Sequence, residues 1–429
     1  MSENHVIKVA LLGLGTVGNG VYKTLQGQMD EMNFKIGADV EIKHILVRNL
    51  EKAAQKVENP EILTNDWNRI INDPEVSIVI ELMGGMEPAR SYMLQALKAG
   101  KHVVSANKDL IAADGQELLE TAQEYNCDFL YEAAVAGGIP IIRPLKQCLA
   151  GNHITEVMGI VNGTTNFILT RMTQDGMEFE DALKLAADLG YAEADPTADI
   201  EGLDAGRKVA ILASAAFNSR VVFDDVYTEG ITKITAKDIR YAKEMGWDIK
   251  LLGVARNTAD GIEARVHPML IESNHPLASV NDSYNAVFVI GDAVQDTMFY
   301  GRGAGELPTA SAVVGDVFDI VRNMLAGCCG RIGCTCYKTL SVKKMDQIKS
   351  KYFIRMQVDD RYGVLASVAS VFGNNSVSIA QVIQKKKRKD SAEIVLITDM
   401  VRECHLKDAI KIFEGMSIIK EISSLIRVY

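Results

Sequence analysis

The sequence lacks an apolar stretch that could cross a membrane, and it lacks a secretory signal. None of its apolar runs reaches the roughly 18 uncharged residues that a membrane helix needs. The first apolar run, Val6 to Val17, is interrupted by Lys8 and has no small-residue cleavage site. We therefore expect a cytoplasmic protein with no membrane partner.

The chain also lacks the basic excess of a nucleic-acid-binding protein. It has 46 Lys and Arg against 56 Asp and Glu, which gives a formal net charge of −10. Because nucleic-acid-binding faces are usually basic, we expect no nucleic-acid partner. With 48% hydrophobic residues, the 429-residue chain is typical of folded proteins, and its length suits two or three domains.

The first third of the chain alternates short apolar runs with amphipathic stretches. The apolar runs predict strands at Ile7–Leu12, Val40–Val47, Val76–Leu82, His102–Ser105 and Phe129–Glu132. Strands that alternate with helices form βαβ units around a parallel sheet. We predict an α/β fold in which a doubly wound Rossmann domain, residues 1–140, is closed by a helix within 305–326.

Two further domains are predicted after the first. Residues 141–304 mix helices with strands and predict an inserted α+β domain, with Thr235 and Asp238 at capping-box-like spacing before one helix. Residues 352–429 follow the order strand, helix, strand, strand, helix, strand of a ferredoxin-like unit. Residues 327–351 form a cysteine-containing linker between them.

A glycine-rich turn follows the first predicted strand and opens a helix. Its residues are Gly13, Leu14, Gly15, Thr16, Val17 and Gly18. In this context, Gly13 permits a tight turn, Gly15 lets the backbone approach a pyrophosphate, and Gly18 allows close packing of helix and strand. The pattern predicts a nicotinamide dinucleotide site, and the alternative is a glycine turn without a ligand.

The tip of the second strand carries Arg48 instead of an acidic residue. Enzymes that use NAD usually place Asp or Glu there, whereas arginine suits the 2′-phosphate of NADP. Arg48 therefore favours NADPH over NADH. The alternative is a solvated arginine at a strand end.

The segment 190–199 contains three carboxylates and leads into a helix-like stretch that begins at Leu203. Asp204 and Lys208 are four residues apart, on one face of the expected helix. The alternative is a surface ion pair, which contributes little. Pro196 and the neighbouring glycines constrain the segment, and no histidine lies in a comparable charged cluster, so Lys208 is the best proton-transfer candidate.

Six motifs together resemble the homoserine dehydrogenase family over residues 7–326. They are GLGTVG at 13–18, SANKDLIA at 105–112, EAAVAGGIPII at 132–142, GIVNGTTNFIL at 159–169, GYAEADPTADIEGLDAGRK at 190–208 and GAGELPTASAVVGD at 303–316. The resemblance implies an NAD(P)-dependent oxidoreductase that reduces L-aspartate 4-semialdehyde to L-homoserine in threonine and methionine biosynthesis. Because the first strand begins by Ile7, we expect a monofunctional enzyme without a preceding kinase region.

The resemblance also assigns residue roles. Lys208 is similar to the general acid/base of the family and Lys108 to a second active-site lysine near the nicotinamide. The residues implied to bind substrate are Glu193, Asp204, Asp199, Gly163 and Thr164, the last two in a loop. Ser105, Lys108, Gly190 and Gly305 are implied near the cofactor, beside the glycine turn and Arg48.

The loop after residue 131 resembles a monovalent-cation site of the family. There, backbone carbonyls hold a sodium ion, and by position these belong to Glu132, Val135, Gly137 and Ile139. The alternative is a plain strand-to-helix turn. Residues 141–304 are implied to bind substrate and to form a homodimer or homotetramer.

The carboxyl-terminal unit resembles an ACT domain, an amino-acid-sensing module. The turn at 359–363 and the segment 372–379 offer polar groups near helix ends, and we expect threonine to be the effector. The alternative is a packing or assembly module that binds no effector.

Four cysteines, Cys328, Cys329, Cys334 and Cys336, crowd into the linker. Their spacing departs from the CxxC pairs of structural zinc sites. Three interpretations stay open: free thiols, a metal or iron–sulfur site, and a redox disulfide.

Two other functions compete with this prediction. One is a nucleotide sensor without catalysis, against which the acidic cluster around Lys208 argues. The other is an oxidoreductase that acts on a related amino-acid aldehyde.

Overall fold

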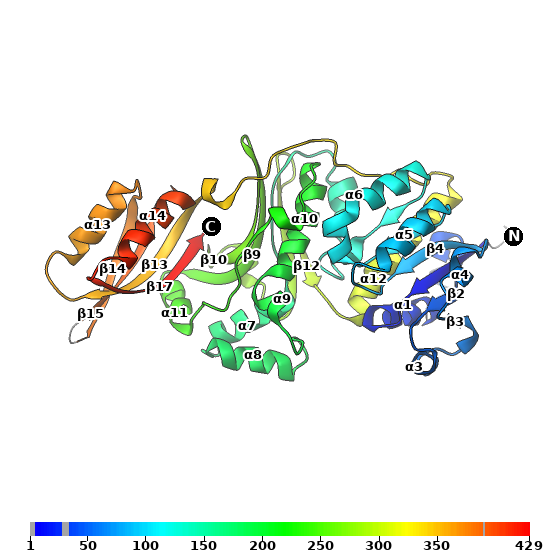
Figure 1. Ribbon diagram of the computed structural model, residues 1–429, viewed down its shortest axis with the longest axis horizontal. Coiled ribbons are helices and arrows are strands. Elements are labelled where there is room, and N and C mark those ends of the chain that lie inside the picture. The colour runs from blue at the N-terminus through cyan, green and yellow to red at the C-terminus, as the bar shows by residue number, and fades with distance from the viewer. Residues whose placement is uncertain (1–4, 28–33, 389–390) are drawn as a thin grey trace. The chain divides into compact units, whose positions relative to one another are not determined.

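The computed structural model describes residues 5–27, 34–388 and 391–429 (Figure 1). The chain forms two compact units, each assembled from three segments. The first comprises Met1–Val157, Arg207–Phe223 and Asn285–Leu340, and the second Met158–Gly206, Asp224–Tyr284 and Ser341–Tyr429. Each unit is therefore built from parts of the chain that are distant in sequence.

The first unit contains a six-stranded parallel sheet in the order β3-β2-β1-β4-β5-β6. The strands are β1 (Val6–Leu12), β2 (Asp39–Leu46), β3 (Leu63–Thr64), β4 (Val76–Glu81), β5 (His102–Ser105) and β6 (Phe129–Leu130). This order is that of the Rossmann fold, so the predicted α/β class is confirmed. Only β3 was not predicted, because a two-residue strand carries no periodic signal.

Helices cover this sheet. They are α1 (Thr16–Gly27), α3 (Leu50–Ala54), α4 (Asn68–Ile71), α5 (Ala89–Lys98), α6 (Lys108–Glu124) and α12 (Glu306–Leu325). The buried side chains of α12, among them Val313, Val317 and Ile320, join the same apolar core as those of β1 and α1. The helix predicted to close this domain is thus present.

The first unit also holds a small antiparallel element. It comprises β11 (Tyr284–Gly291), β12 (Gln295–Arg302) and the first residues of β7 (Ile154–Ile160), in the order β12-β11-β7. The division between the units falls within β7, at Val157. The division also falls within helix α10 (Leu203–Phe217), after Gly206.

The second unit is built on a mixed sheet in the order β7-β9-β10-β17-β13-β15-β14. Its long strands are β9 (Trp247–Thr258), β10 (Gly261–Glu272), β13 (Lys349–Asp359), β14 (Ile379–Arg388), β15 (Ser391–Thr398) and β17 (Ile419–Val428), with short strands β8 (Tyr227–Thr228) and β16 (Val401–Arg402). Strand β17 pairs antiparallel with β13 and, through its last residues, parallel with β10, where Leu270 faces Val428. The carboxyl-terminal strands therefore continue the sheet of β9 and β10.

The helices of the second unit are α7 (Gly163–Gln174), α8 (Phe179–Asp188), α9 (Thr197–Ile200), α11 (Ala236–Glu244), α13 (Val364–Asn374) and α14 (Glu403–Glu414). The capping box before α11 is confirmed, because Thr235 and Asp238 exchange both of its hydrogen bonds. Gly163 opens α7 rather than lying in a loop, which differs from the sequence-based expectation. Among the described helices, none combines the length and apolar character needed to cross a membrane.

The order β13, α13, β14, β15, α14, β17 matches the predicted ferredoxin-like succession. The contacts group these elements with 158–206 and 224–284 in one unit. The predicted domain boundaries, including the separate domain at 352–429, stay predictions.

Candidate active site

The glycine turn after β1 is shaped by two close backbone approaches. Gly13 has φ +99°, and a Cβ there would lie 2.9 Å from the carbonyl oxygen of Leu82. A Cβ on Gly18 would lie 2.2 Å from the carbonyl oxygen of Gly13. A Cβ on Gly15 would meet no atom within 4 Å, so its backbone is open to a ligand. The turn presents the start of α1, where unpaired N–H groups favour a phosphate.

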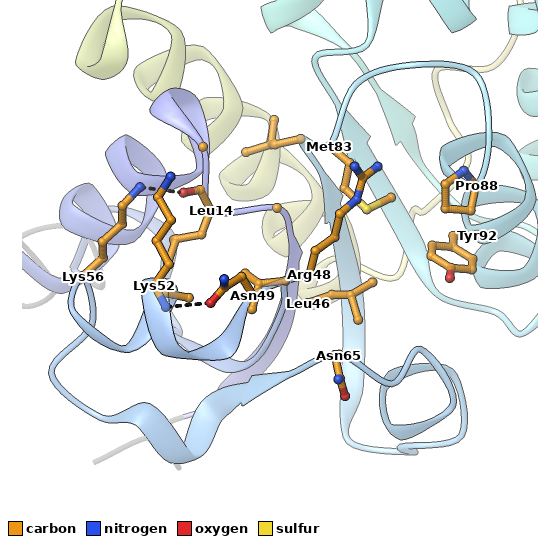
Figure 2. Close-up of a pocket in the computed structure, with 15 residues that line it drawn as sticks. Leu14, Leu46, Arg48, Asn49, Lys52, Lys56, Asn65, Met83, Pro88 and Tyr92 are labelled. Atoms are coloured by element: carbon orange, nitrogen blue, oxygen red, sulfur yellow. Dashed lines mark hydrogen bonds between the residues drawn. The ribbon is translucent and has the colours of Figure 1, made fainter.

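A cavity of about 680 Å³ lies beside this turn, at the carboxyl ends of β1, β2 and β4. Figure 2 shows three basic side chains in its wall, with Arg48 near Met83 and with Lys52 and Lys56 on the side of Leu14. Lys56 donates from Nζ to the Leu14 carbonyl at 3.2 Å. Within the described part of the chain, no carboxylate pairs with Arg48 or Lys52. The cavity therefore offers positive charge to an anionic ligand.

One buried carboxylate near this cavity was missed by the sequence analysis. Glu81, at the end of β4, is fully buried and accepts hydrogen bonds from the N–H groups of Met83 (2.8 Å) and Gly84 (3.2 Å). Its other oxygen accepts from Ser105 Oγ at 2.8 Å. Burial raises the pKa of Glu81, while these donors lower it. Glu81 lies at the end of a predicted strand, and the glycine pair Gly84 and Gly85 follows three residues later. This pattern is the signal that could have identified it.

Ser105 and Lys108 lie on either side of the turn that joins β5 to α6. Ser105 Oγ accepts from the N–H of Asn107 at 3.0 Å, so Glu81 holds this turn through Ser105. Asn107 caps α6, because its Oδ1 accepts from Leu110 N at 3.2 Å, and its Nδ2 donates to the Gly85 carbonyl at 2.7 Å. Lys108 is the first residue of α6 and is partly buried.

An ion pair joins the segments that carry the two candidate lysines. Arg207 Nε lies 2.6 Å from Asp109 Oδ1, and these residues directly adjoin Lys208 and Lys108 in sequence. Arg220, further along the chain after α10, also donates to the carbonyl of Ile111 on α6 at 3.3 Å. The structure thus brings the start of α6 and the Lys208 segment of α10 together within the first unit.

Two of the three predicted substrate carboxylates meet in the second unit. Asn162 Nδ2 donates to Asp199 Oδ1 at 2.6 Å and to Asp204 Oδ2 at 2.9 Å. Glu193 is exposed in the segment between α8 and α9, and these hydrogen bonds do not include it. Thr164, at the start of α7, donates from Oγ1 to the Tyr191 carbonyl at 2.8 Å. The first turn of α7 is therefore tied to the acidic segment.

Close packing of glycines holds the turn between Asp199 and Asp204. Gly202 has φ +78°, and a Cβ on Gly230 would lie 2.0 Å from the Ile200 carbonyl oxygen. Ile231 N donates to that carbonyl at 2.8 Å. The sequence did not single out Gly230, because its neighbour Ile200 is 30 residues away.

The loop after Tyr131 is buried and sharply bent. Ala136 and Gly137 have φ +57° and +52°, and a Cβ on Gly137 would lie 2.4 Å from the Gly303 carbonyl oxygen. The Glu132 carboxylate accepts from the N–H groups of Ile141, Ile142 and Arg143.

Three carbonyl oxygens of this loop accept no hydrogen bond from any residue that the structure describes. Among hydrogen bonds between described residues, none ends on the carbonyl oxygen of Val135, Gly137 or Ile139, although Val135 and Ile139 are almost fully buried. Buried carbonyls are normally paired, and oxygen ligands of this kind suit a hard cation. These carbonyl oxygens therefore fit a hard cation.

Gly190 and Gly305 both adopt backbone conformations that favour glycine. Gly190 follows α8 with φ +76°, in the second unit. Gly305 precedes α12 with φ +129°, in the first unit. Their predicted proximity to the cofactor stays a prediction.

The linker cysteines do not form a four-thiolate site. All seven cysteines are free, and among the described residues no three of the linker sulfur atoms lie within 4.8 Å of one another. Cys329 instead lies near His102 and Asp128. The His102 Nδ1 atom accepts from Asp128 N at 2.9 Å, and the Asp128 carboxylate accepts from Gly330 N and Asn323 Nδ2. One ligand atom from each of these three residues lies within 4.8 Å of the others, so among the described residues this group could hold a metal ion, with a single cysteine from the linker.

These features define the class of protein. A parallel sheet in Rossmann order, a glycine turn and a basic cavity at the strand ends characterise a nicotinamide-dinucleotide-binding oxidoreductase. Residues 13–132 match the family model described as homoserine dehydrogenase, NAD binding domain, and residues 140–318 match the model described as homoserine dehydrogenase.

Relatives extend this match over the whole chain. The chain is 44% identical to homoserine dehydrogenase of Bacillus subtilis (strain 168) over 98% of each chain. It is 46% identical to that of a Synechocystis species, over 98% of this chain and 99% of the other. The chain therefore belongs to the homoserine dehydrogenase family of oxidoreductases.

Solved structures agree with this assignment. The homoserine dehydrogenase of Thiobacillus denitrificans matches with a TM-score of 0.94 at 42% identity, over 99% of this chain and 98% of that one. The S. aureus enzyme matches with a TM-score of 0.78 at 36% identity over the whole of both chains.

A buried lysine supports α7 from β9. Lys250 Nζ donates to the Val280 carbonyl at 2.6 Å and to Asn281 Oδ1 at 3.1 Å, and it lies 3.5 Å from Asn166 Oδ1 on α7. Burial lowers the pKa of Lys250 to about 8, from an ordinary value of 10.5.

This shift predicts a pH-dependent stability. Between pH 8 and 10.5 the unfolded chain binds the Lys250 proton more tightly than the folded chain, so folding is favoured as the pH rises through this window. We expect the unfolding free energy of the parent, relative to Lys250→Met, to rise by about 2–3 kcal/mol between pH 7 and 10. Urea unfolding at both pH values measures this. Lys98→Met, at an exposed lysine, is the control. A constant difference between parent and Lys250→Met would contradict the assigned shift.

Proposed function

We propose that the chain interconverts L-aspartate 4-semialdehyde and L-homoserine with a nicotinamide cofactor. The observation that carries this proposal is the Arg207–Asp109 ion pair, which joins the segments of Lys208 and Lys108 in the unit that also holds the dinucleotide cavity. Two lysines in one region suit a reaction in which negative charge develops on an oxygen atom.

The chemistry divides between cofactor and protein. The bound cofactor supplies or accepts the hydride at the substrate carbon. Lys208 transfers the proton to or from the substrate oxygen, since reduction of an aldehyde needs one proton on oxygen. Lys108 stabilises the developing alkoxide charge.

The substrate also carries an ammonium and a carboxylate group. Asp199, Asp204 and Glu193 are assigned to the ammonium. The backbone N–H groups of Gly163 and Thr164, at the start of the 12-residue helix α7, are assigned to the carboxylate. These substrate contacts are supported by the hydrogen bonds that gather Asp199 and Asp204 beside α7.

The proton-transfer role predicts a large loss of turnover. Lys208→Ala should lower kcat by about 10²–10⁴-fold, the usual contribution of a general acid/base. The measurement is homoserine oxidation followed at 340 nm, with circular dichroism to verify folding. Lys184→Ala, at an exposed lysine of α8, is the matched control. A folded Lys208→Ala enzyme with near-normal kcat would remove Lys208 from this role.

We further propose NADPH as the preferred cofactor. Arg48, Lys52 and Lys56 line the cavity, and the described residues that line it include no acidic one. A 2′-phosphate would find charge-assisted donors there, whereas the ribose hydroxyls of NADH would lack their usual carboxylate.

Arg48→Ala should separate the two cofactors. Loss of a charged hydrogen bond is expected to raise KM for NADPH about 10- to 100-fold and to change KM for NADH less than about 3-fold. Initial rates with each cofactor measure this, and Arg69→Ala, outside the cavity, is the control. Equal changes for both cofactors would argue against 2′-phosphate recognition.

We propose a sodium ion at the carbonyls of Glu132, Val135, Gly137 and Ile139. The unpaired carbonyl oxygens of the last three support it. An ion there would stabilise the bent loop that Gly303 packs against. Activity that is equal in sodium and in tetramethylammonium salts would contradict this assignment.

We also propose that β13–β17 with α13 and α14 form an ACT domain that binds threonine as a feedback effector. A cavity of about 220 Å³ is lined there by Asp359, Asp360 and the start of α13. Assembly as a homodimer or homotetramer and a place in threonine and methionine synthesis stay predictions.

The effector site is best tested by a point substitution. Removing the carboxyl terminus would also remove β17 from the side of β10, so truncation would damage the remaining sheet. Ala366→Trp, in the cavity wall, should abolish threonine inhibition without changing activity in its absence. Ala369→Trp, an exposed position of α13 outside the cavity, is the control. Unchanged inhibition of Ala366→Trp would place threonine elsewhere.

A further inference from the structure

One side chain holds two carboxylates of the acidic segment, those of Asp199 and Asp204. Asn162, which is 5% exposed, donates one Nδ2 hydrogen to Asp199 and the other to Asp204. An amide nitrogen has two hydrogens, so these two bonds use its full donor capacity. Both carboxylates are therefore held within hydrogen-bonding distance of a single nitrogen atom.

The orientation of this amide is fixed from its other end. Asn162 Oδ1 accepts from the N–H of Thr165 at 2.9 Å and from Thr165 Oγ1 at 2.8 Å. This is the amino-terminal cap of α7, for which asparagine is among the best residues. Rotating the amide by half a turn would place NH₂ against the Thr165 N–H and the amide oxygen against two carboxylate acceptors, so Nδ2 faces the carboxylates.

The two aspartates need such a constraint because they repel one another. Asp199 lies in α9, a helix of four residues, and Asp204 lies in the first turn of α10, with Gly202 between them. Like charges at short distance disfavour each other's ionised form and push the groups apart. A neutral donor shared by both carboxylates offsets this repulsion and fixes their spacing.

We propose that Asn162 is a positioning residue that sets the spacing of Asp199 and Asp204 for the substrate ammonium. This inference rests on the proposed function, because it takes an α-amino acid as the substrate. An ammonium has three hydrogens and can bond two carboxylates at once when they are held close together. Asn162 thereby couples the first turn of α7 to the ammonium site.

The test separates the two roles of the Asn162 side chain. Its Oδ1 atom caps α7, and its Nδ2 atom donates to the carboxylates. Asn162→Ser and Asn162→Asp both keep an oxygen that caps α7, and both lose the NH₂ group. We expect KM for L-homoserine to rise about 10- to 100-fold in both variants, the effect of losing hydrogen bonds to charged groups. KM for the cofactor should change less than about 2-fold.

An inhibitor that lacks the ammonium distinguishes positioning from general damage. 4-Hydroxybutanoate lacks the ammonium, so its inhibition constant should change much less than KM for homoserine. Thr170→Val is the matched control, since it removes a buried hydroxyl of the same helix, which donates to the Asn166 carbonyl at 2.7 Å, without contacting either aspartate. Equal losses for both ligands, or a Thr170→Val enzyme with the same homoserine defect, would overturn the proposal.

A crystal structure of Asn162→Ser gives a readout that does not depend on activity. The Asp199 and Asp204 carboxylates should lie further apart than in the parent, and an unchanged spacing would overturn the positioning role. A parent enzyme that does not oxidise homoserine would instead refute the proposed function, while the measured spacing would still decide the role of Asn162.

Discussion

The first unit depends on the return of α12 to the parallel sheet. The apolar side chains of α12 complete the core around β1, β4 and α1, although about 280 residues separate α1 from α12. Without them, one face of the sheet would be open to water, and burial of such apolar surface is the main driving force of folding. The chain must therefore leave this unit and come back to it.

The return of α12 also builds the candidate cation loop. The turn that precedes α12 contains Gly303, whose carbonyl oxygen approaches Gly137 too closely for any side chain there. Within α12, Asp316 accepts from the N–H of Glu132 at 2.8 Å and from Arg143 Nη2 at 2.5 Å. One packing requirement thus fixes the ends of a loop in which the carbonyl oxygens of Val135, Gly137 and Ile139 accept no hydrogen bond from a described residue.

Sequence patterns predicted the elements whose signals are local. The Rossmann strands, the capping box at Thr235 and the succession of the last six elements all follow from residues close to one another in the chain. The pairing of β10 with β17 was not predicted, because it involves two residue pairs about 158 positions apart. Such contacts depend on tertiary packing, which local propensity does not encode.

The same limit applies to the candidate site. Asp204 and Lys208 were recognised because they are four residues apart, whereas Asn162 meets Asp204 from 42 residues away. Buried charge was missed for a related reason. Arg355, only 5% exposed, bonds Asp238 at 2.9 Å and Glu393 at 3.2 Å, while charged residues are ordinarily expected at the surface.

That buried network gives the carboxyl-terminal strands a defined place in the second unit. Arg355 lies on β13, Glu393 on β15 and Asp238 on α11, and Lys237 Nζ adds a contact to Glu393 at 2.5 Å. Replacing one partner would leave an uncompensated charge, which is strongly destabilising. An ion network of this kind therefore favours one arrangement of α11 on the sheet over others with similar apolar contact.

Helix α10 imposes a final constraint on the proposed chemistry. The division between the two units falls after Gly206, so Asp204 belongs to one unit and Lys208 to the other. Both lie on the same helix, in which four residues correspond to a rise of about 6 Å. Helix geometry therefore sets the rise between the residue proposed to bind the ammonium and the residue proposed to transfer the proton. A short sequence motif can for this reason carry both proposed roles, while the side chain proposed to orient Asp204 comes from another part of the chain.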